Sequence, residues 1–569
     1  MSETTLSASF GDTPPAIAPQ GQLAHPATIA HTKRLERKLY QFGANAWCMV
    51  GNGLSNQSFV EGPEGLIVID TGECVEEMQS ALDEVRKFTS APVVACIYTH
   101  FHYVNGTTAL LEATKDGKLD IYGHSGIVAN RQRYGGEVGP RTTRGLVHQF
   151  GIVLPTEGED GLVNVGLGNH FRNAEHHPFT AGHIPATETF DTETTMTIAG
   201  LEVRCTPAPS DASDSITIWF PELEVCINNI LWPTLFNVFA IRGEEYRDPR
   251  ILLTGLDHLA TLGANYLLGA HGPPLTGKTE IAESVLDYRD SIQFLWDQTV
   301  RGANKGLSLD ELTSFVQLPE RFERTYLTQQ YYGVVEHHVK QIHAGLFGWF
   351  DEDAGNLFPM PPVERAKRLI EGFGGRQTVR DCVSDALGKS DFRWAIELAN
   401  WLVGFEPEQE DKQLLADALR GVSQRTTAAN IRNWCLTRVL ELEGKLNLDR
   451  FRIHRIRFDE VMASSAGTYV PVLRVLLDPA KAQGLEEELC WHFDDGTSSG
   501  LKVRGQVAIP TTGEEASLSI TLSQHTWANL LGGKKSLSES IDEGLIVTEN
   551  DLERVKRYFS VFDVPAFQN

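Results

Sequence analysis

The sequence lacks the features that mark membrane-spanning, secreted and disulfide-rich proteins. No stretch approaches the roughly 18–20 consecutive apolar residues of a membrane helix, so we expect no membrane span. The N-terminus has no basic start followed by an apolar block, so we recognise no Sec signal and predict a cytoplasmic protein. The eight cysteines are scattered and form no Cys-x-x-Cys pair, which favours reduced, mostly packed thiols.

Basic residues are few relative to acidic residues. The chain has 50 Lys and Arg against 75 Asp and Glu, which gives a formal net charge of −25. A nucleic-acid-binding surface needs clustered Lys and Arg, so we expect no nucleic-acid partner. A small anionic substrate would need a local basic pocket, because the field of the whole molecule repels it.

Changes in the hydrophobic pattern along the 569 residues divide the chain into a leader and three domains. Residues 1–35 are rich in Ser, Thr, Ala and Pro, and we expect a disordered leader. Residues 36–285 alternate between short apolar strands and helices, as in an α/β domain. Residues 286–428 show helical periodicity, and residues 429–569 return to a mixed α+β pattern.

Two predicted strands end in polar residues that can carry chemistry. The apolar run at residues 66–69 ends at Asp70, and the run at residues 92–98 ends at Thr99-His100-Phe101-His102. Ligands of open α/β folds bind beyond the C-terminal ends of strands. Two histidines one residue apart at such an end can both face a metal, and neutral imidazole suits Zn, Mn or Fe. The alternative for this segment is a polar turn.

Further short motifs lie along most of the chain after residue 35. They include Gly53-Leu54-Ser55-Asn56, Thr234-Leu235-x-Asn237, Ile241-Arg242-Gly243, Ala270-His271-x-Pro273 and Gly348-Trp349-Phe350-Asp351. Together with Thr99-His100-x-His102, these motifs resemble the linear alkylsulfatases, the dodecyl-sulfate-hydrolysing branch of the metallo-β-lactamase fold.

This resemblance implies an architecture and an activity. The implied fold class is α/β + α + α+β: a metallo-β-lactamase αββα sandwich, a helical dimerisation domain and a sterol-carrier-protein-like C-terminal domain. The implied protein is a homodimeric hydrolase with a small-molecule anionic or alkyl substrate. It would cleave a sulfate ester, sulfamate or related small organic anion with metal-activated water.

The resemblance also implies which residues bind the metal. In the family, two metals lie among a His-x-His-x-Asp-His motif, two glutamates and a further histidine. His100 and His102 match the first two positions, and His271 matches the last histidine. The first glutamate corresponds to Asp211, or to Asp214 if the alignment slips.

Three departures from the family pattern affect the other metal. Val104, Asn105 and Asn229 fall at the positions of the motif aspartate, the motif histidine and the second glutamate. Valine cannot coordinate a cation, and an asparagine carbonyl substitutes poorly for imidazole. We therefore expect a divalent metal, with Zn favoured over Mn or Fe, and a site for one ion in place of two.

The substrate side of the site follows from the same resemblance. Arg242 matches the arginine that holds the sulfate group, and Asn237 matches the neighbouring amide. An arginine fork offers two parallel donors to sulfate oxygens. Phe236 stands where the family has its general-acid histidine, so a leaving alkoxide would receive no proton from it. Tyr103, between the site histidines, is a candidate for tuning the metal centre.

Three alternatives stay open at this point. Two histidines and one carboxylate also form the ligand set of non-haem iron oxygenases, which would place another reaction class on the same scaffold. The site could instead be built from the crowded histidines His170, His176, His177 and His183. The chain could also be a catalytically inactive dimeric binding protein.

Overall fold

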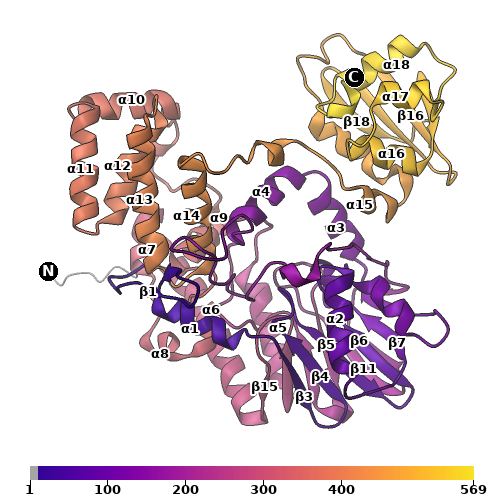
Figure 1. Ribbon diagram of the computed structural model, residues 1–569, viewed down its shortest axis with the longest axis horizontal. Coiled ribbons are helices and arrows are strands. Elements are labelled where there is room, and N and C mark those ends of the chain that lie inside the picture. Colours follow the sequence, from indigo (N-terminus) through magenta and orange to yellow (C-terminus); the bar gives the residue numbers. More distant parts are fainter. Residues whose placement is uncertain (1–9, 569) are drawn as a thin grey trace. The chain divides into compact units, whose positions relative to one another are not determined.

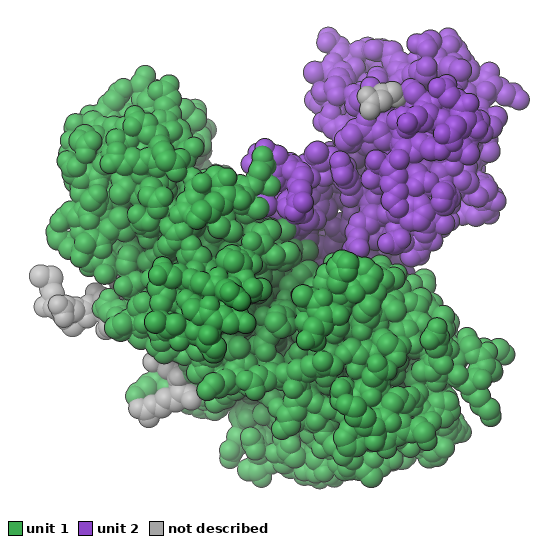
Figure 2. Space-filling model, in the orientation of Figure 1, with its two compact units in different colours: residues 1–127, 145–447 green, residues 128–144, 448–569 purple. Residues whose placement is uncertain are grey.

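The chain folds into two compact units (Figure 2). The structure is a computed structural model that describes residues 10–568, apart from the side chains of residues 323 and 324. Unit 1 comprises residues up to 127 and residues 145–447, and unit 2 comprises residues 128–144 and 448–569.

Seven strands of unit 1 form one mixed sheet in the order β3-β4-β5-β6-β7-β8-β9. They are β3 (Lys38–Phe42), β4 (Ala46–Val50), β5 (Gln57–Gly62), β6 (Gly65–Ile69), β7 (Val93–Ile97), β8 (Asp120–His124) and β9 (Glu188–Phe190). Strands β6 to β9 are parallel, and α2 (Val75–Val85) connects β6 to β7. Strand β6 is buried along its whole length, which explains its uninterrupted apolar sequence. The parallel pairing brings Asp70 and the residues after β7 to one edge of the sheet.

Six further strands form a second sheet in the order β10-β11-β12-β13-β14-β15. They are β10 (Thr194–Ile198), β11 (Leu201–Pro207), β12 (Ile216–Phe220), β13 (Val225–Asn228), β14 (Tyr266–Gly269) and β15 (Leu275–Thr276). Side chains of both sheets, such as Ile97 and Ile218, meet in one buried cluster. Cys226 faces the other way and packs with α5 (Pro249–Thr261) and α6 (Lys278–Ala303). With α2 against β5 on the outer face of the first sheet, the layers are helix, sheet, sheet and helix (Figure 1), which confirms the predicted αββα sandwich.

Helices form the rest of unit 1. They are α7 (Leu309–Phe315), α8 (Glu320–Arg324), α9 (Val335–Phe347), α10 (Pro362–Gly372), α11 (Arg376–Gly388), α12 (Phe392–Gly404), α13 (Gln409–Arg425) and α14 (Ala429–Leu442). Helix α6 crosses the domain boundary expected after residue 285. The boundary expected after residue 428 lies inside unit 1, because α14 packs on α13. None of the described helices combines the length and hydropathy that crossing a membrane requires.

Part of the segment expected as a disordered leader has regular structure. It contains β1 (Ala16–Ile17), β2 (Leu23–Ala24) and α1 (Pro26–Arg34), whereas residues 1–9 lie outside the described residues. His31 of α1 is buried, and its Nε2 lies 2.7 Å from the Gly166 carbonyl. Its ring stacks on Tyr331 with a centroid distance of 4.1 Å. These long-range contacts explain why composition alone gave the wrong expectation for this helix.

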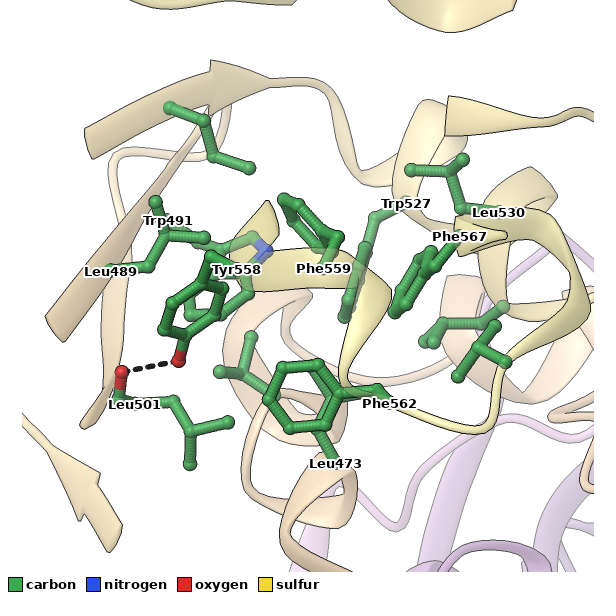
Figure 3. Packing of buried hydrophobic residues seen from close by; sticks show 14 of the residues in the cluster. Leu473, Leu489, Trp491, Leu501, Trp527, Leu530, Tyr558, Phe559, Phe562 and Phe567 are labelled. Atoms are coloured by element: carbon green, nitrogen blue, oxygen red, sulfur yellow. Dashed lines mark hydrogen bonds between the residues drawn. The ribbon is translucent and has the colours of Figure 1, made fainter. Parts of the chain in front are cut away.

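Unit 2 has its own sheet and its own apolar core. The five strands run in the order β18-β17-β16-β19-β20: β16 (Glu487–Phe493), β17 (Ser498–Arg504), β18 (Val507–Thr511), β19 (Leu518–Leu522) and β20 (Ile546–Val547). The helices are α15 (Phe458–Met462), α16 (Gln524–Leu531), α17 (Leu537–Asp542) and α18 (Leu552–Ser560), together with residues 128–144 of α3 (Ile127–Gly135) and α4 (Gly139–Gln149). Trp491, Trp527 and Phe559 pack together in the core, where the Tyr558 hydroxyl donates to the Leu501 carbonyl (Figure 3). The predicted α+β character is confirmed.

Candidate metal centre

A hydrogen-bonded turn at the end of β7 presents His100 and His102. Asp70, at the end of β6, has a left-handed backbone with φ of 58° and accepts a hydrogen bond of 2.8 Å from the Thr99 amide. The Thr99 hydroxyl donates to the same carboxylate and lies 2.9 Å from His100 Nδ1. With its proton directed at Asp70, this hydroxyl accepts from His100 Nδ1–H, which places the imidazole lone pair on Nε2.

Asp211 converges with these two histidines. His100 Nε2 lies 3.0 Å from His102 Nδ1, and Asp211 Oδ2 lies 3.2 Å from His102 Nδ1 and 3.9 Å from His100 Nε2. All the potential ligand atoms lie within 4.8 Å of one another. Asp214 is buried as well but is not part of this group, so Asp211 is the carboxylate that the fold brings to the histidines.

The charge state of this group suits a divalent cation. Burial lowers the pKa of His100 to about 3, so its imidazole is neutral at neutral pH. Burial opposes ionisation of Asp211, but the nearby His100, His102 and Arg247 hold the pKa of its carboxyl well below the usual range. Metal ligands must be deprotonated, and two imidazoles with one carboxylate occur in catalytic zinc sites. These residues therefore fit one divalent cation.

The positions that would hold a second cation offer no comparable donor set. Val104 is fully buried and has no donor atom. The Asn229 Nδ2 amide donates to Asp211 Oδ1 over 2.7 Å and to Ser210 Oγ over 3.1 Å, so its nitrogen binds the carboxylate of the first group. The Asn105 backbone bonds to Gly72 O over 3.1 Å. Among the described residues, no further ligand group forms around these positions.

His271 lies beside the group of three without joining it. Its Nδ1 lies 3.0 Å from the Leu54 carbonyl, so the ring donates there and Nε2 carries the lone pair. The Tyr103 hydroxyl lies 3.2 Å from that Nε2. Burial raises the pKa of Tyr103 well above its ordinary value, so the hydroxyl stays protonated and donates to His271. This pairing differs from the ligand role expected for His271.

A buried ion-pair cluster lies next to His102. The Glu244 carboxylate accepts from Arg242 Nε over 2.7 Å and also contacts Arg242 Nη2 and Arg247 Nη2. Its Oε1 lies 3.7 Å from His102 Nε2. Burial opposes ionisation of Glu244, but Arg242 and Arg247 lower the pKa of its carboxyl. The candidate sulfate arginine is therefore already paired with an internal carboxylate.

Asn237 and Phe236 both lie close to Arg247. The Arg247 Nη1 donates to the Asn237 carbonyl over 2.7 Å, and Asn237 Oδ1 lies 3.2 Å from His338 Nε2. The buried Asn237 Nδ2 has no hydrogen-bond partner among the described residues. Phe236 is fully buried against Trp232, with a centroid distance of 4.5 Å. Its position therefore offers no proton donor.

Sequence reasoning missed Glu244 and Tyr332. The Tyr332 hydroxyl accepts from Arg242 Nη1 over 3.1 Å, although Tyr332 lies 90 residues further along the chain. The signal for Glu244 was its place two residues after a candidate anion-binding arginine. Of the four crowded histidines, His170 and His177 are exposed, His183 is half-buried and His176 is buried next to other residues. None of the four joins the group of His100, His102 and Asp211.

Comparisons with known proteins agree with the motif resemblance. The alkyl sulfatase dimerisation profile matches residues 308–445, and the alkyl sulfatase C-terminal profile matches residues 457–568. The linear primary-alkylsulfatase of Pseudomonas sp. (strain ATCC 19151) is 34% identical over 522 residues, covering 89% of this chain and 98% of that protein. The (R)-specific secondary-alkylsulfatase of Pseudomonas sp. is 27% identical over 566 residues, covering 96% and 83%.

Solved structures give the same result. The stereoselective inverting sec-alkylsulfatase Pisa1 from Pseudomonas sp. matches with a TM-score of 0.85 at 25% sequence identity. The match covers 95% of this chain and 87% of that chain. The chain therefore shares the fold of that relative along most of its length.

Proposed function

Because the chain belongs to the alkylsulfatase family, we propose that it hydrolyses a sulfate ester or a related small organic anion. The observation that supports this proposal is the convergence of His100, His102 and Asp211. His102 Nε2 also lies 3.7 Å from the buried Glu244 carboxylate, which pairs with two arginines. A site of this kind combines cation ligands with anion-binding groups, which is the pairing that hydrolysis of a charged ester requires.

We propose that His100, His102 and Asp211 hold one zinc ion. A divalent cation bound there supplies Lewis acidity and lowers the pKa of a coordinated water. The Thr99 hydroxyl orients His100 through Nδ1, and Glu244 faces the far nitrogen of His102. Such outer contacts fix the direction of a ligating imidazole. The Asn229 amide holds the second oxygen of Asp211.

The arginine cluster supplies the local positive charge that the acidic chain needs. Arg242 and Arg247 carry two positive charges and Glu244 one negative charge, so the cluster keeps a net charge of +1. That charge matches a sulfate monoester, which carries a single negative charge. The unpartnered Asn237 Nδ2 adds a buried donor in the residue whose carbonyl accepts from Arg247. We assign the sulfate group of the substrate to these side chains.

The leaving group receives no proton from Phe236. This side chain is fully buried and apolar, so it cannot neutralise a departing alkoxide. A substrate whose leaving oxygen is already a weak base needs no such proton. We therefore propose an ester of an acidic alcohol or phenol as the preferred substrate.

We propose that the protein works as a homodimer. The dimerisation profile of the family covers residues 308–445. Within that range, Trp349 is 73% exposed and Phe358 is 91% exposed. Exposed large apolar side chains that cluster in one segment mark an interaction surface.

The direct test measures bound metal and sulfate release from a panel of sulfate esters with the full-length protein. His102→Ala should remove the bound ion and reduce sulfate release by roughly 100-fold or more, since even outer-shell partners of a metal contribute about 10–100-fold. His170→Ala, at an exposed histidine outside the site, is the matched control. Metal-loaded wild-type protein that releases no sulfate from any ester would refute the proposal. No observation favours the redox or inactive alternatives.

A further inference from the structure

A second group of ligand atoms lies at the start of α2, separate from the candidate metal centre. Atoms of Cys74, Glu77 and His176 lie within 4.8 Å of one another, and all three residues are buried. Cys74 is the N-cap of α2 and Glu77 lies in its first turn, whereas His176 comes from the short 3₁₀ turn Ala174–His176. None of these residues occupies a ligand position implied by the family resemblance.

His176 is the residue that most needs a partner. It is 4% exposed, and neither Nδ1 nor Nε2 has a hydrogen-bond partner among the described residues. A neutral imidazole offers one donor and one acceptor, and each buried polar group left unpaired costs about 1–3 kcal/mol. A bound species that takes the imidazole lone pair would remove one of these costs.

Glu77 is held with its carboxylate fixed in place. The Gln57 side-chain amide donates to Oε1 over 2.8 Å, and the Glu73 backbone amide donates to Oε2 over 3.1 Å. Each carboxylate oxygen has a second lone pair that these bonds leave unused. A Cβ atom at Gly53 or Gly72 would collide with this carboxylate, so glycine at both positions makes room for it.

We propose that Cys74, Glu77 and His176 form a second divalent-cation site, and that zinc is its preferred ion. A thiolate, an imidazole and a carboxylate are all zinc ligands, and the thiolate selects against magnesium and calcium. Burial raises the pKa of the Cys74 thiol and of the Glu77 carboxyl, so a bound cation would displace their protons. The resulting thiolate and carboxylate would carry two negative charges, which balance a 2+ ion in a buried setting. Three protein donors leave one tetrahedral position for water.

The proposed cation would support the turn that carries the first site. The turn between β6 and α2 bonds to the segment after His102: the Thr71 amide donates to the Tyr103 carbonyl over 2.8 Å, and the Asn105 amide donates to the Gly72 carbonyl over 3.1 Å. The Gly182 amide donates to the Asn105 carbonyl over 2.7 Å. A cation that joins Cys74 to His176 would therefore brace this turn without touching a substrate.

The test is a cobalt titration of the full-length, metal-free wild-type protein. Only the second site contains sulfur, so a near-ultraviolet thiolate-to-cobalt charge-transfer band reports on it alone. We expect this band to saturate at about one cobalt ion per chain, and elemental analysis to find about two zinc ions per chain. His102→Ala should lose one of these ions and keep the thiolate band. Wild-type protein that shows no thiolate band contradicts the proposal.

Variants separate the second site from the first. Cys74→Ala and His176→Ala should each lose the band and about one zinc equivalent while keeping the ion at His100 and His102. His177→Ala, at the exposed neighbour of His176, is the matched control and should keep both ions. A band that persists in Cys74→Ala would overturn the assignment. Because the wild-type titration needs no variant to fold and no catalysis, its outcome is independent of the proposed activity.

Discussion

Replacing Glu244 with glutamine should convert the arginine cluster into an open anion site. The Glu244 carboxylate is 3% exposed and pairs with Arg242 and Arg247, whose side chains are 7% and 2% exposed. Glu244→Gln keeps the size of the side chain and removes the charge that balances the two guanidinium groups. The net charge of the cluster then rises from +1 to +2.

Two magnitudes follow from this geometry. Removing one partner of a buried ion pair lowers the free energy of unfolding by about 3–5 kcal/mol. The glutamine amide oxygen can still accept a hydrogen bond from an arginine, so we expect a loss of about 3 kcal/mol in Glu244→Gln. A hydrogen bond to a charged group contributes about 1.5–3 kcal/mol, so an external anion that replaces the carboxylate gains roughly that amount. At about 1.4 kcal/mol per factor of ten, inorganic sulfate should bind roughly 10- to 100-fold more tightly than to wild type.

The assay is calorimetric titration of metal-free protein with sodium sulfate, together with thermal melting at increasing sulfate concentration. Metal-free protein isolates the arginines from any anion bound to a cation. Glu244→Gln should melt below wild type and recover with sulfate, whereas Glu245→Gln, at an exposed neighbour, should behave as wild type. Equal stability and equal sulfate affinity in Glu244→Gln and wild type would show that this carboxylate does not neutralise the pair.

Three further predictions concern the leaving group, acid stability and assembly. The rate of sulfate release by wild type should rise steeply with the acidity of the leaving alcohol or phenol across a series of aryl sulfates. Phe236→His should weaken this dependence, because the imidazole can protonate the leaving oxygen. A wild-type rate that does not vary across the series would contradict the prediction. Burial lowers the pKa of His31 from 6.5 to about 4, so the unfolded chain binds the extra proton and stability falls as the pH drops from about 6.5 towards 4. Between pH 6.5 and 4, the free energy of unfolding of His31→Gln should fall by up to about 3 kcal/mol less than that of wild type, at about 1.36 kcal/mol per pKa unit. Denaturant titrations at several pH values measure this difference, and equal pH profiles of variant and wild type would refute the prediction. Trp349→Ser combined with Phe358→Ser should reduce the molar mass in light scattering from two chains to the 63.0 kDa of one. A double variant that keeps the mass of two chains would show that these side chains do not form the dimer interface.

The arginine cluster provides local positive charge in a chain whose overall charge is strongly negative. The formal net charge of −25 would oppose binding of a sulfate ester over the whole surface. The structure concentrates compensation in one buried place, where Arg242 and Arg247 outnumber Glu244. For the proposed sulfate site, the relevant charge is therefore local, and the Glu244 carboxylate reduces it by one unit.

Local sequence was sufficient to predict the two strands that carry the site and the pair of histidines after the second strand. The buried run of β6 and the next run at β7 were recognised from contiguous apolar residues, because a strand buried on both faces has an uninterrupted apolar sequence. His100 and His102 were found together because their spacing is local. The order of the domains followed from changes in periodicity over long windows.

The resemblance to the family left a choice between two aspartates, and the geometry of the fold resolved it. Asp211 and Asp214 are both acidic and lie three residues apart, but Asp211 alone reaches the two histidines. The chain reverses direction in this turn, so side chains three residues apart point to different surroundings. The helix α1, found where we expected a disordered leader, also depends on tertiary contacts, since His31 contacts Gly166 and Tyr331.

The sequence by itself determined the strands, the domain order and the His-x-His pair, because each of these depends on residues that are neighbours in the chain. Only the tertiary structure decided the partners of the charged and polar groups. It paired Tyr103 with His271 across 168 residues and placed Glu244 between Arg242 and Arg247. The physical reason is that a buried polar group needs a partner in space, and the fold supplies that partner from any distance along the chain.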